Sequence, residues 1–113
     1  MLARVNRVVT ADDYRATVRT GRKSVSAHAA VYLRRREEIA APRFGFIVSK
    51  AVGNAVQRNL MRRRLKTVCA GILGTVPDGL DLVIRMLPGA AQITWSNLEQ
   101  EMTVLLTRGL AKL

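Results

Sequence analysis

The chain has few of the residues that build covalent frameworks and catalytic centres. Its 113 residues include one cysteine, Cys69, and one histidine, His28. A single cysteine excludes an internal disulfide framework, and one residue of each type cannot give the ligand spacing of a metal site. No apolar run approaches the roughly 20 residues of a membrane span. The N-terminus lacks the continuous apolar segment of a secretory signal. We therefore expect a cytoplasmic protein without a membrane partner.

Acidic side chains are also scarce. The chain carries eight Asp and Glu residues against nineteen Lys and Arg, a formal net charge of +11. Residues 1–77 hold sixteen basic and four acidic residues, and no acid occurs between Glu38 and Asp78. A surface of one charge sign attracts phosphates and makes binding depend steeply on salt. The charge therefore favours RNA as a partner over a basic surface kept only for solubility.

Candidates for catalysis by this chain alone are weak. Asp12 and Asp13 are adjacent, which suits a helix start better than a two-metal site. Ser49 and Lys50 are neighbours in a predicted strand, where successive side chains point to opposite faces. His28 has no cysteine or carboxylate close to it in sequence. The residues thus indicate binding rather than catalysis.

The hydrophobic pattern predicts intermixed helices and strands. Thr10 is a plausible N-cap for the first helix, and Gly21 is its natural stop. Ser96 and Glu99 fit a capping box at the start of the last helix. An extra short strand fits around Val25. The predicted elements are a helix at 12–20, strands at 24–36 and 43–50, a helix at 54–73, a strand at 81–87 and a helix from Ser96.

Two strands carry side chains that matter for the interpretation. In the 24–36 segment, Val31 and Leu33 share one face, so we expect Tyr32 on the opposite face to be exposed. There it could stack an unpaired base, as could Tyr14 on the first helix, although core packing explains either tyrosine too. The 43–50 segment is apolar on both faces, which predicts a central strand.

The long helix separates an apolar stripe from a basic face. Apolar residues recur at i, i+4, i+7 and i+11 from Met61, the spacing of a core-facing stripe. Polar residues recur every three or four positions on an adjacent face. Arginine and lysine are the residues that bind phosphates. We call this set the basic ridge: Arg58, Asn59, Arg62, Arg63 and Lys66.

The stretch GFIVSKAVGNAVQRNLMRRRLK, residues 45–66, resembles the signature of the bacterial ribonuclease P protein subunit. Asn6-Arg7, Asp13-Tyr14 and Gly21 resemble the opening pattern of that family, and DLVIRMLPGA resembles its fourth strand. Leu60 and Ala51 stand where the signature has basic residues. The matching positions of the central motif are Gly45, Val48, Ser49, Lys50, Gly53, Ala55, Val56, Arg58, Asn59, Arg62 and Arg63.

The resemblance implies a fold and a function. The fold is a single α/β (α+β) two-layer domain over residues 1–113 in the order α-β-β-β-α-β-α. It has a four-stranded sheet beside a long basic helix and is related to a ribosomal protein domain. The function is that of the protein subunit of an endoribonuclease, ribonuclease P. Catalysis would belong to an RNA subunit that holds most of the Mg²⁺, and the protein by itself would be monomeric.

The resemblance also assigns roles to residues. The basic ridge would bind the catalytic RNA. The 5′ leader of precursor tRNA would lie in a cleft between the sheet and the long helix. Asn54 matches a position that the family associates with metal, although an N-cap explains an asparagine there equally well. A general RNA-binding or ribosome-associated protein is the main alternative, but it does not explain the motif. The candidates for the leader cleft are Tyr14, Ala30, Tyr32, Ile47, Ser49 and Lys50.

Overall fold

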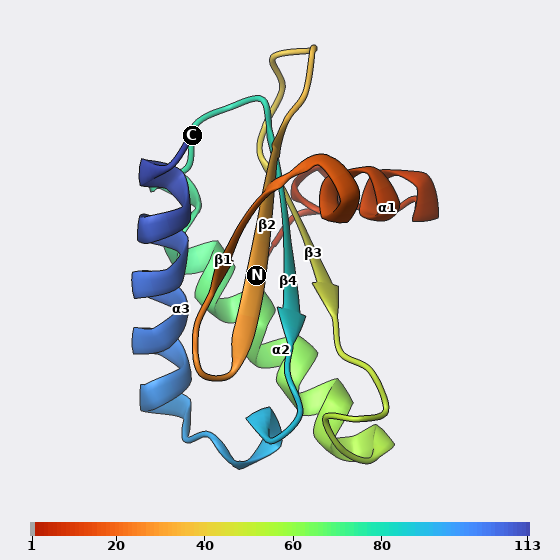
Figure 1. Ribbon diagram of the computed structural model, residues 1–113, viewed down its shortest axis with the longest axis vertical. Coiled ribbons are helices and arrows are strands. Elements are labelled where there is room, and N and C mark those ends of the chain that lie inside the picture. Colours follow the sequence, from red (N-terminus) through yellow and green to blue (C-terminus); the bar gives the residue numbers. More distant parts are fainter. Residues whose placement is uncertain (1) are drawn as a thin grey trace.

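Three α-helices and one four-stranded sheet form the structure, a computed structural model that describes residues 2–113 (Figure 1). Short 3-10 turns lie at Arg4–Asn6, Leu73–Thr75 and Ala90–Gln92. The order of elements confirms the predicted α-β-β-β-α-β-α arrangement and the mixed fold class. The elements are α1 (Ala11–Thr20), β1 (Arg22–Val25), β2 (Ala29–Arg35), β3 (Arg43–Ile47), α2 (Ala55–Ile72), β4 (Leu80–Met86) and α3 (Trp95–Ala111).

The strands lie in the order β1-β2-β4-β3. Strand β2 pairs antiparallel with β1 and β4, whereas β3 runs parallel to β4. The 24–36 segment is therefore a hairpin, and the short strand expected around Val25 is β1. Strand β3 lies at the edge of the sheet, so the prediction that it is central is wrong. It is apolar on both faces because helices cover both faces of the sheet at this edge.

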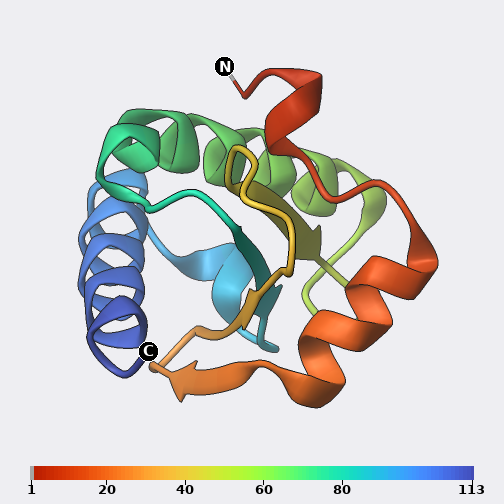
Figure 2. The ribbon, with the colours of Figure 1, turned by 90° about the horizontal axis from the view of Figure 1, so that it is seen from above.

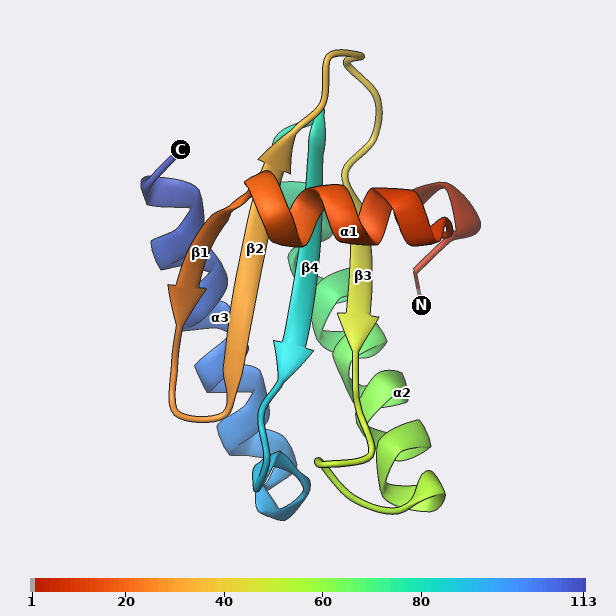
Figure 3. The same ribbon diagram turned by 45° about the vertical axis from the view of Figure 1, so that its right-hand side comes forward.

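The two faces of the sheet are covered unequally (Figures 2 and 3). Helices α2 and α3 pack on one face and enclose the main core, to which the strands contribute residues such as Val31, Leu33 and Ile84. The predicted stripe of α2 points into this core, where Met61 and Leu65 are buried. Helix α1 crosses the opposite face and leaves one half of that face uncovered (Figure 3).

A second, smaller core lies under α1. Ala30, Tyr32 and Val83 form it, and Tyr14 and Val18 of α1 pack against them. Tyr32 is only 5% exposed. The prediction that Tyr32 is exposed is therefore wrong, although its placement opposite Val31 and Leu33 is right. The strand alternation gave the face correctly, but it could not show that α1 would cover that face.

Side chains at the helix starts satisfy backbone N–H groups. The Thr10 hydroxyl accepts from the N–H of Asp13 at 3.1 Å, as predicted for α1. Helix α3 begins at Trp95, because the Thr94 hydroxyl accepts from the N–H of Asn97 at 3.2 Å. The helix thus begins near Ser96 as predicted, but the predicted capping box of Ser96 and Glu99 is wrong, because Thr94 is the N-cap. The Thr94 hydroxyl lies three residues before the N–H that it caps, which is the usual spacing of an N-cap.

A buried carboxylate ties the strands together at one end of the sheet. Asp81 of β4 is fully buried. It accepts hydrogen bonds from Arg43 of β3 at 2.7 and 2.8 Å and from Arg34 of β2 at 2.7 Å. Arg36 forms an ion pair with it at 3.2 Å. Asp13 of α1 lies 3.4 Å from both Arg34 and Arg43, so the cluster also holds α1.

Two opposing effects set the pKa of Asp81. Burial by itself would raise the pKa of this carboxyl group. The hydrogen bonds from Arg43 and Arg34 and the charges of Arg43 and Arg36 outweigh burial, and the pKa of Asp81 is lowered from its ordinary value. The carboxylate is therefore the stable form in the fold.

The β1–β2 turn is fixed to α3 through Glu101. Its carboxylate accepts from the Ser26 hydroxyl at 2.6 Å and from the backbone N–H of His28 at 2.8 Å. The Nδ1 atom of His28 lies 2.7 Å from the same carboxylate. Burial would raise the pKa of Glu101, but these hydrogen bonds lower it. His28 thus has a structural partner that is distant in sequence.

The sulfur atoms of residues 2–113 all lie in the main core. Met61, Cys69, Met86 and Met102 are each at most 2% exposed. Burial raises the pKa of the Cys69 thiol, so the thiol stays protonated. Cys69 is therefore a small apolar core residue, as its place in the helical pattern predicts.

Across residues 2–113, no helix combines the length and the apolar character that crossing a membrane requires.

Candidate RNA interface

The basic ridge follows α2 as the sequence predicts. Asn59 and Arg63 are exposed, and Arg58, Arg62 and Lys66 are half-buried. Helix α2 contains no acidic residue. Within residues 2–113, no carboxylate forms an ion pair with the ridge, and those that are paired have basic partners elsewhere. The ridge therefore keeps its positive charge for an external anion.

Arg62 is held in place by neutral partners. One guanidinium nitrogen donates to the backbone carbonyl of Val48 at 3.2 Å, and another donates to the Asn59 side chain at 3.1 Å. These bonds fix the direction of the side chain without cancelling its charge. A fixed guanidinium loses less conformational entropy when it binds a phosphate.

The N-terminal segment adds a cation beside the ridge. Val8 donates to the carbonyl of Phe44 at 2.9 Å, so this segment runs along β3. Arg7 is fixed by hydrogen bonds to the carbonyl of Leu2 at 2.7 and 3.2 Å. It lines a pocket of about 240 Å³ together with Arg62 and Lys66. Arg7 belongs to no periodic pattern, so only the resemblance drew attention to it.

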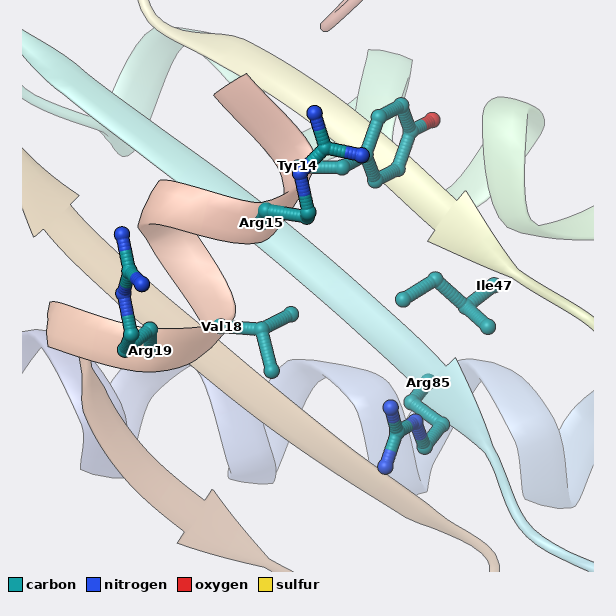
Figure 4. A pocket seen from close by; sticks show the side chains of 6 residues that line it. All are labelled: Tyr14, Arg15, Val18, Arg19, Ile47 and Arg85. Atoms are coloured by element: carbon teal, nitrogen blue, oxygen red, sulfur yellow. The ribbon is translucent and has the colours of Figure 1, made fainter. Parts of the chain in front are cut away.

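The main core fills much of the space between the sheet and α2, but the pocket of about 240 Å³ lies between β3 and α2 beside the ridge. The placement of a leader strand beside the long helix therefore stays a prediction. Another pocket, of about 320 Å³, lies between the sheet and α1, and we call it the α1 groove. Figure 4 shows α1 contributing one wall and the ends of β3 and β4 contributing the floor. The residues that line it are Tyr14, Arg15, Val18, Arg19, Ile47 and Arg85.

Tyr14 joins the α1 groove to the ridge. It is half-buried and lines both the groove and the pocket that contains Arg62 and Lys66. Its hydroxyl oxygen accepts from the backbone N–H of Phe46 at 3.1 Å. A β-carbon on Gly45 would lie 2.6 Å from the Tyr14 ring, so only glycine at that position permits this placement. An aromatic ring is thus fixed between two basic surfaces.

The structure separates the predicted cleft residues into three groups. Tyr14 and Ile47 line the α1 groove. Ser49 and Lys50 are exposed, just beyond the end of β3. The other two, Ala30 and Tyr32, lie beneath the surface in the second core. No contact in the structure tests a role in leader binding for any of the six.

Three arginines of the groove were missed by sequence reasoning. Arg15 and Arg19 lie one turn apart on α1, and Arg85 is the only charged residue between Leu82 and Leu87. The signal for Arg85 was present, because a single charge in an apolar strand indicates a functional or paired side chain. The arginines of α1 gave no such signal, since charges on a short surface helix are common.

Asn54 caps α2 through two reciprocal hydrogen bonds. Its side-chain oxygen accepts from the N–H of Gln57 at 2.8 Å, and the Gln57 side chain accepts from the N–H of Asn54 at 2.9 Å. This capping box accounts for the asparagine. Residues 2–113 contain no group of three His, Cys, Asp or Glu side chains that could hold a metal ion. Contact between Asn54 and a metal stays a prediction.

Comparisons with known proteins agree with the resemblance. A family model described as Ribonuclease P matches residues 2–109. A ribonuclease P protein component from Clavibacter michiganensis subsp. michiganensis is 52% identical over 108 residues, which cover 96% of both chains. Another, from Pseudarthrobacter chlorophenolicus, is 39% identical over 113 residues and covers 100% of this chain and 83% of its own.

Solved structures share the fold. The RNase P protein of Staphylococcus aureus superposes with a TM-score of 0.85 at 22% identity, over 90% of this chain and 93% of its own. That of Thermotoga maritima superposes with a TM-score of 0.79 at 20% identity, over 90% and 96% of the two chains. The family model and the curated relatives, which align over nearly the whole chain, show that the chain belongs to the ribonuclease P protein component family.

Proposed function

We propose that this chain, as the protein subunit of the endoribonuclease ribonuclease P, binds the RNA subunit with the basic ridge and the 5′ leader of precursor tRNA with the α1 groove. The observation that carries the proposal is the position of Tyr14, which lines both the α1 groove and the pocket that contains Arg62 and Lys66. A strand in the groove and an RNA helix on the ridge would then meet at one fixed ring.

The ridge has the properties of a phosphate-binding surface. It is basic, free of acids and partly fixed by backbone bonds. Such contacts position an RNA without reading its sequence. The groove suits a single strand better. It combines the Tyr14 ring with arginines at its edges, and base stacking beside cations is the usual way to hold unpaired nucleotides.

Magnesium would come with the RNA. Around Asn54, the residues from Gly53 to Gln57 offer amide groups but no carboxylate. Mg²⁺ is normally bound through carboxylates or phosphates and keeps several waters. The residues around Asn54 therefore do not fit a magnesium site formed by the protein alone. RNA phosphates would supply the ligands, and by itself the protein would be a monomer that performs no cleavage.

The test compares three mixtures on precursor tRNA with a single-stranded leader: protein, RNA subunit, and both. We expect no cleavage by protein alone. The combined mixture should cleave at the mature 5′ end at lower Mg²⁺ than the RNA subunit alone. It should also bind leader-bearing tRNA more tightly than leaderless tRNA. A general RNA-binding protein would instead strengthen the binding of both tRNAs equally. Cleavage by protein that survives rigorous RNA removal would refute the proposal.

Gly45→Ala should weaken leader binding selectively. The new β-carbon would meet the Tyr14 ring, so the ring must leave its place between groove and ridge. We expect the free energy of binding leader-bearing tRNA to become less favourable by about 1–3 kcal/mol, which is the usual contribution of one stacked base. Affinity for leaderless tRNA should not change. Gly71→Ala is the matched control, because a β-carbon there meets nothing within 4 Å. Equal losses for both tRNAs would contradict a role of Tyr14 in leader binding.

A further inference from the structure

We propose that Tyr32 is a positioning residue: its buried ring holds Lys23 and Arg85 so that these two cations contact phosphates of the leader strand. The proposal rests on the function proposed above and identifies which cations on the sheet bind the leader strand. It assigns Tyr32 a task other than base stacking, for which a ring that is 5% exposed has too little free surface.

The contacts around Tyr32 carry the inference. The Lys23 Nζ atom lies 5.7 Å from the centre of the Tyr32 ring, and the Arg85 guanidinium carbon lies 5.9 Å from it. Both distances are within the range of a cation–π interaction. Lys23 is the cross-strand partner of Tyr32 on β1, and Arg85 comes from β4 on the other side of β2. Two cations therefore converge on one ring from opposite sides of its strand.

The two cations are available to an external anion. Both are exposed, and neither forms an ion pair with a carboxylate in residues 2–113. Arg85 lines the α1 groove (Figure 4), and Lys23 lies on the same face of the sheet. An aromatic ring attracts a cation without neutralising it, so the full charge stays free for a phosphate.

Restricting these side chains should strengthen binding. Long, flexible cationic side chains lose rotamer freedom when an anion fixes them, and this loss weakens binding. The Tyr32 ring restricts them beforehand, so part of this cost is already met in the free protein. Among residues 2–113 the Tyr32 hydroxyl has no hydrogen-bond partner, and the cation–π contacts do not use it. Phenylalanine should therefore replace Tyr32 without loss.

The experiment is a mutant cycle on the assembled holoenzyme. Tyr32→Leu and Tyr32→Phe are each made in the natural chain and in a chain that carries Lys23→Gln with Arg85→Gln. Affinities for leader-bearing and leaderless precursor tRNA are measured over a range of salt concentrations, and melting curves report stability. In the natural chain, we expect Tyr32→Leu to lower the affinity for leader-bearing tRNA about fivefold. An effect of this size corresponds to one or two exposed cation–π contacts. Tyr32→Phe should have no effect.

In the chain without the two cations, Tyr32→Leu should cause no further loss. The double glutamine substitution itself should reduce the salt slope by about 0.7 for each lost contact with a single strand. An equal loss from Tyr32→Leu in both backgrounds would overturn the inference, since stacking or core packing would explain it. The inference would also be overturned if Tyr32→Phe lowered the affinity for leader-bearing tRNA as much as Tyr32→Leu. If the natural holoenzyme showed no preference for the leader, the proposed function would fail as well, whereas a preference retained in every variant would overturn the inference alone.

Discussion

Replacing Asp81 by asparagine is expected to destabilise the fold by about 3–5 kcal/mol, the usual result of removing one partner from a buried ion pair. The change would leave Arg34, Arg36 and Arg43 crowded at one end of the sheet without their shared carboxylate. For a chain of this length, the melting temperature should fall by more than about 12 °C. Thermal unfolding monitored by circular dichroism measures the change. Asp78→Asn, at an exposed position, should stay within about 0.5 kcal/mol of the natural protein.

The effect of Asp81→Asn should depend on pH. The pKa of Asp81 is lower in the folded protein than in the unfolded chain. The carboxylate therefore contributes its full stability above the unfolded pKa of about 3.9, and this contribution is lost as pH falls through the folded pKa. The stability difference between the natural protein and the variant should shrink below about pH 4. Glu101 also titrates in this window, but it does so in both proteins. A difference that stays constant down to pH 2 would show that the charge of Asp81 is not what stabilises the fold.

Removing Arg63 and Lys66 together should weaken binding of the RNA subunit by roughly ten- to a hundredfold. A hydrogen bond to a charged group contributes about 1.5–3 kcal/mol, and solvent screens part of this at a surface. These two residues are chosen because they line one pocket with Arg7 and, unlike Arg62, donate no hydrogen bond to the fold. The salt slope of binding should fall by about 0.7–0.9 for each lost phosphate contact.

The control for this experiment removes the same charge from another helix. Arg108→Gln with Lys112→Gln changes one basic residue in the last turn of α3 and one at its C-cap, away from the ridge. We expect little change in affinity and no change in salt slope, measured by filter binding to the RNA subunit. Equal losses in the two double variants would mean that net charge, rather than the position of α2, determines the affinity.

Local sequence patterns predicted the elements that depend on local chemistry. The caps Thr10 and Asn54, the apolar stripe from Met61 and the alternation along β2 are all present. Each of these features depends only on the spacing of residues along the chain, which can be read from the sequence. The N-cap of α3 was assigned to Ser96 instead of Thr94, because two hydroxyls two residues apart both offered a cap.

The errors concern which segments meet across the sheet. The position of β3 at the edge depends on which strands pair, whereas the burial of Tyr32 and the position of the α1 groove depend on where α1 crosses the sheet. Nothing in the spacing of residues 11–20 fixes that crossing. It depends on the fit of Tyr14 over Gly45 and on the reach of Asp13 to Arg34 and Arg43. Such distant contacts become visible only in three dimensions.

The burial of every sulfur atom in residues 2–113 has a consequence for how the protein is damaged by oxidation. Oxidants attack exposed thiolates and thioethers first, and here Met61, Cys69, Met86 and Met102 are reached only when the main core opens. The rate of their modification thus reports how often the domain opens. Any ligand that binds only the folded form lowers that rate. An RNA bound on the surface would therefore protect sulfur atoms that it never touches, and oxidative damage would fall mainly on copies of the protein that have no RNA.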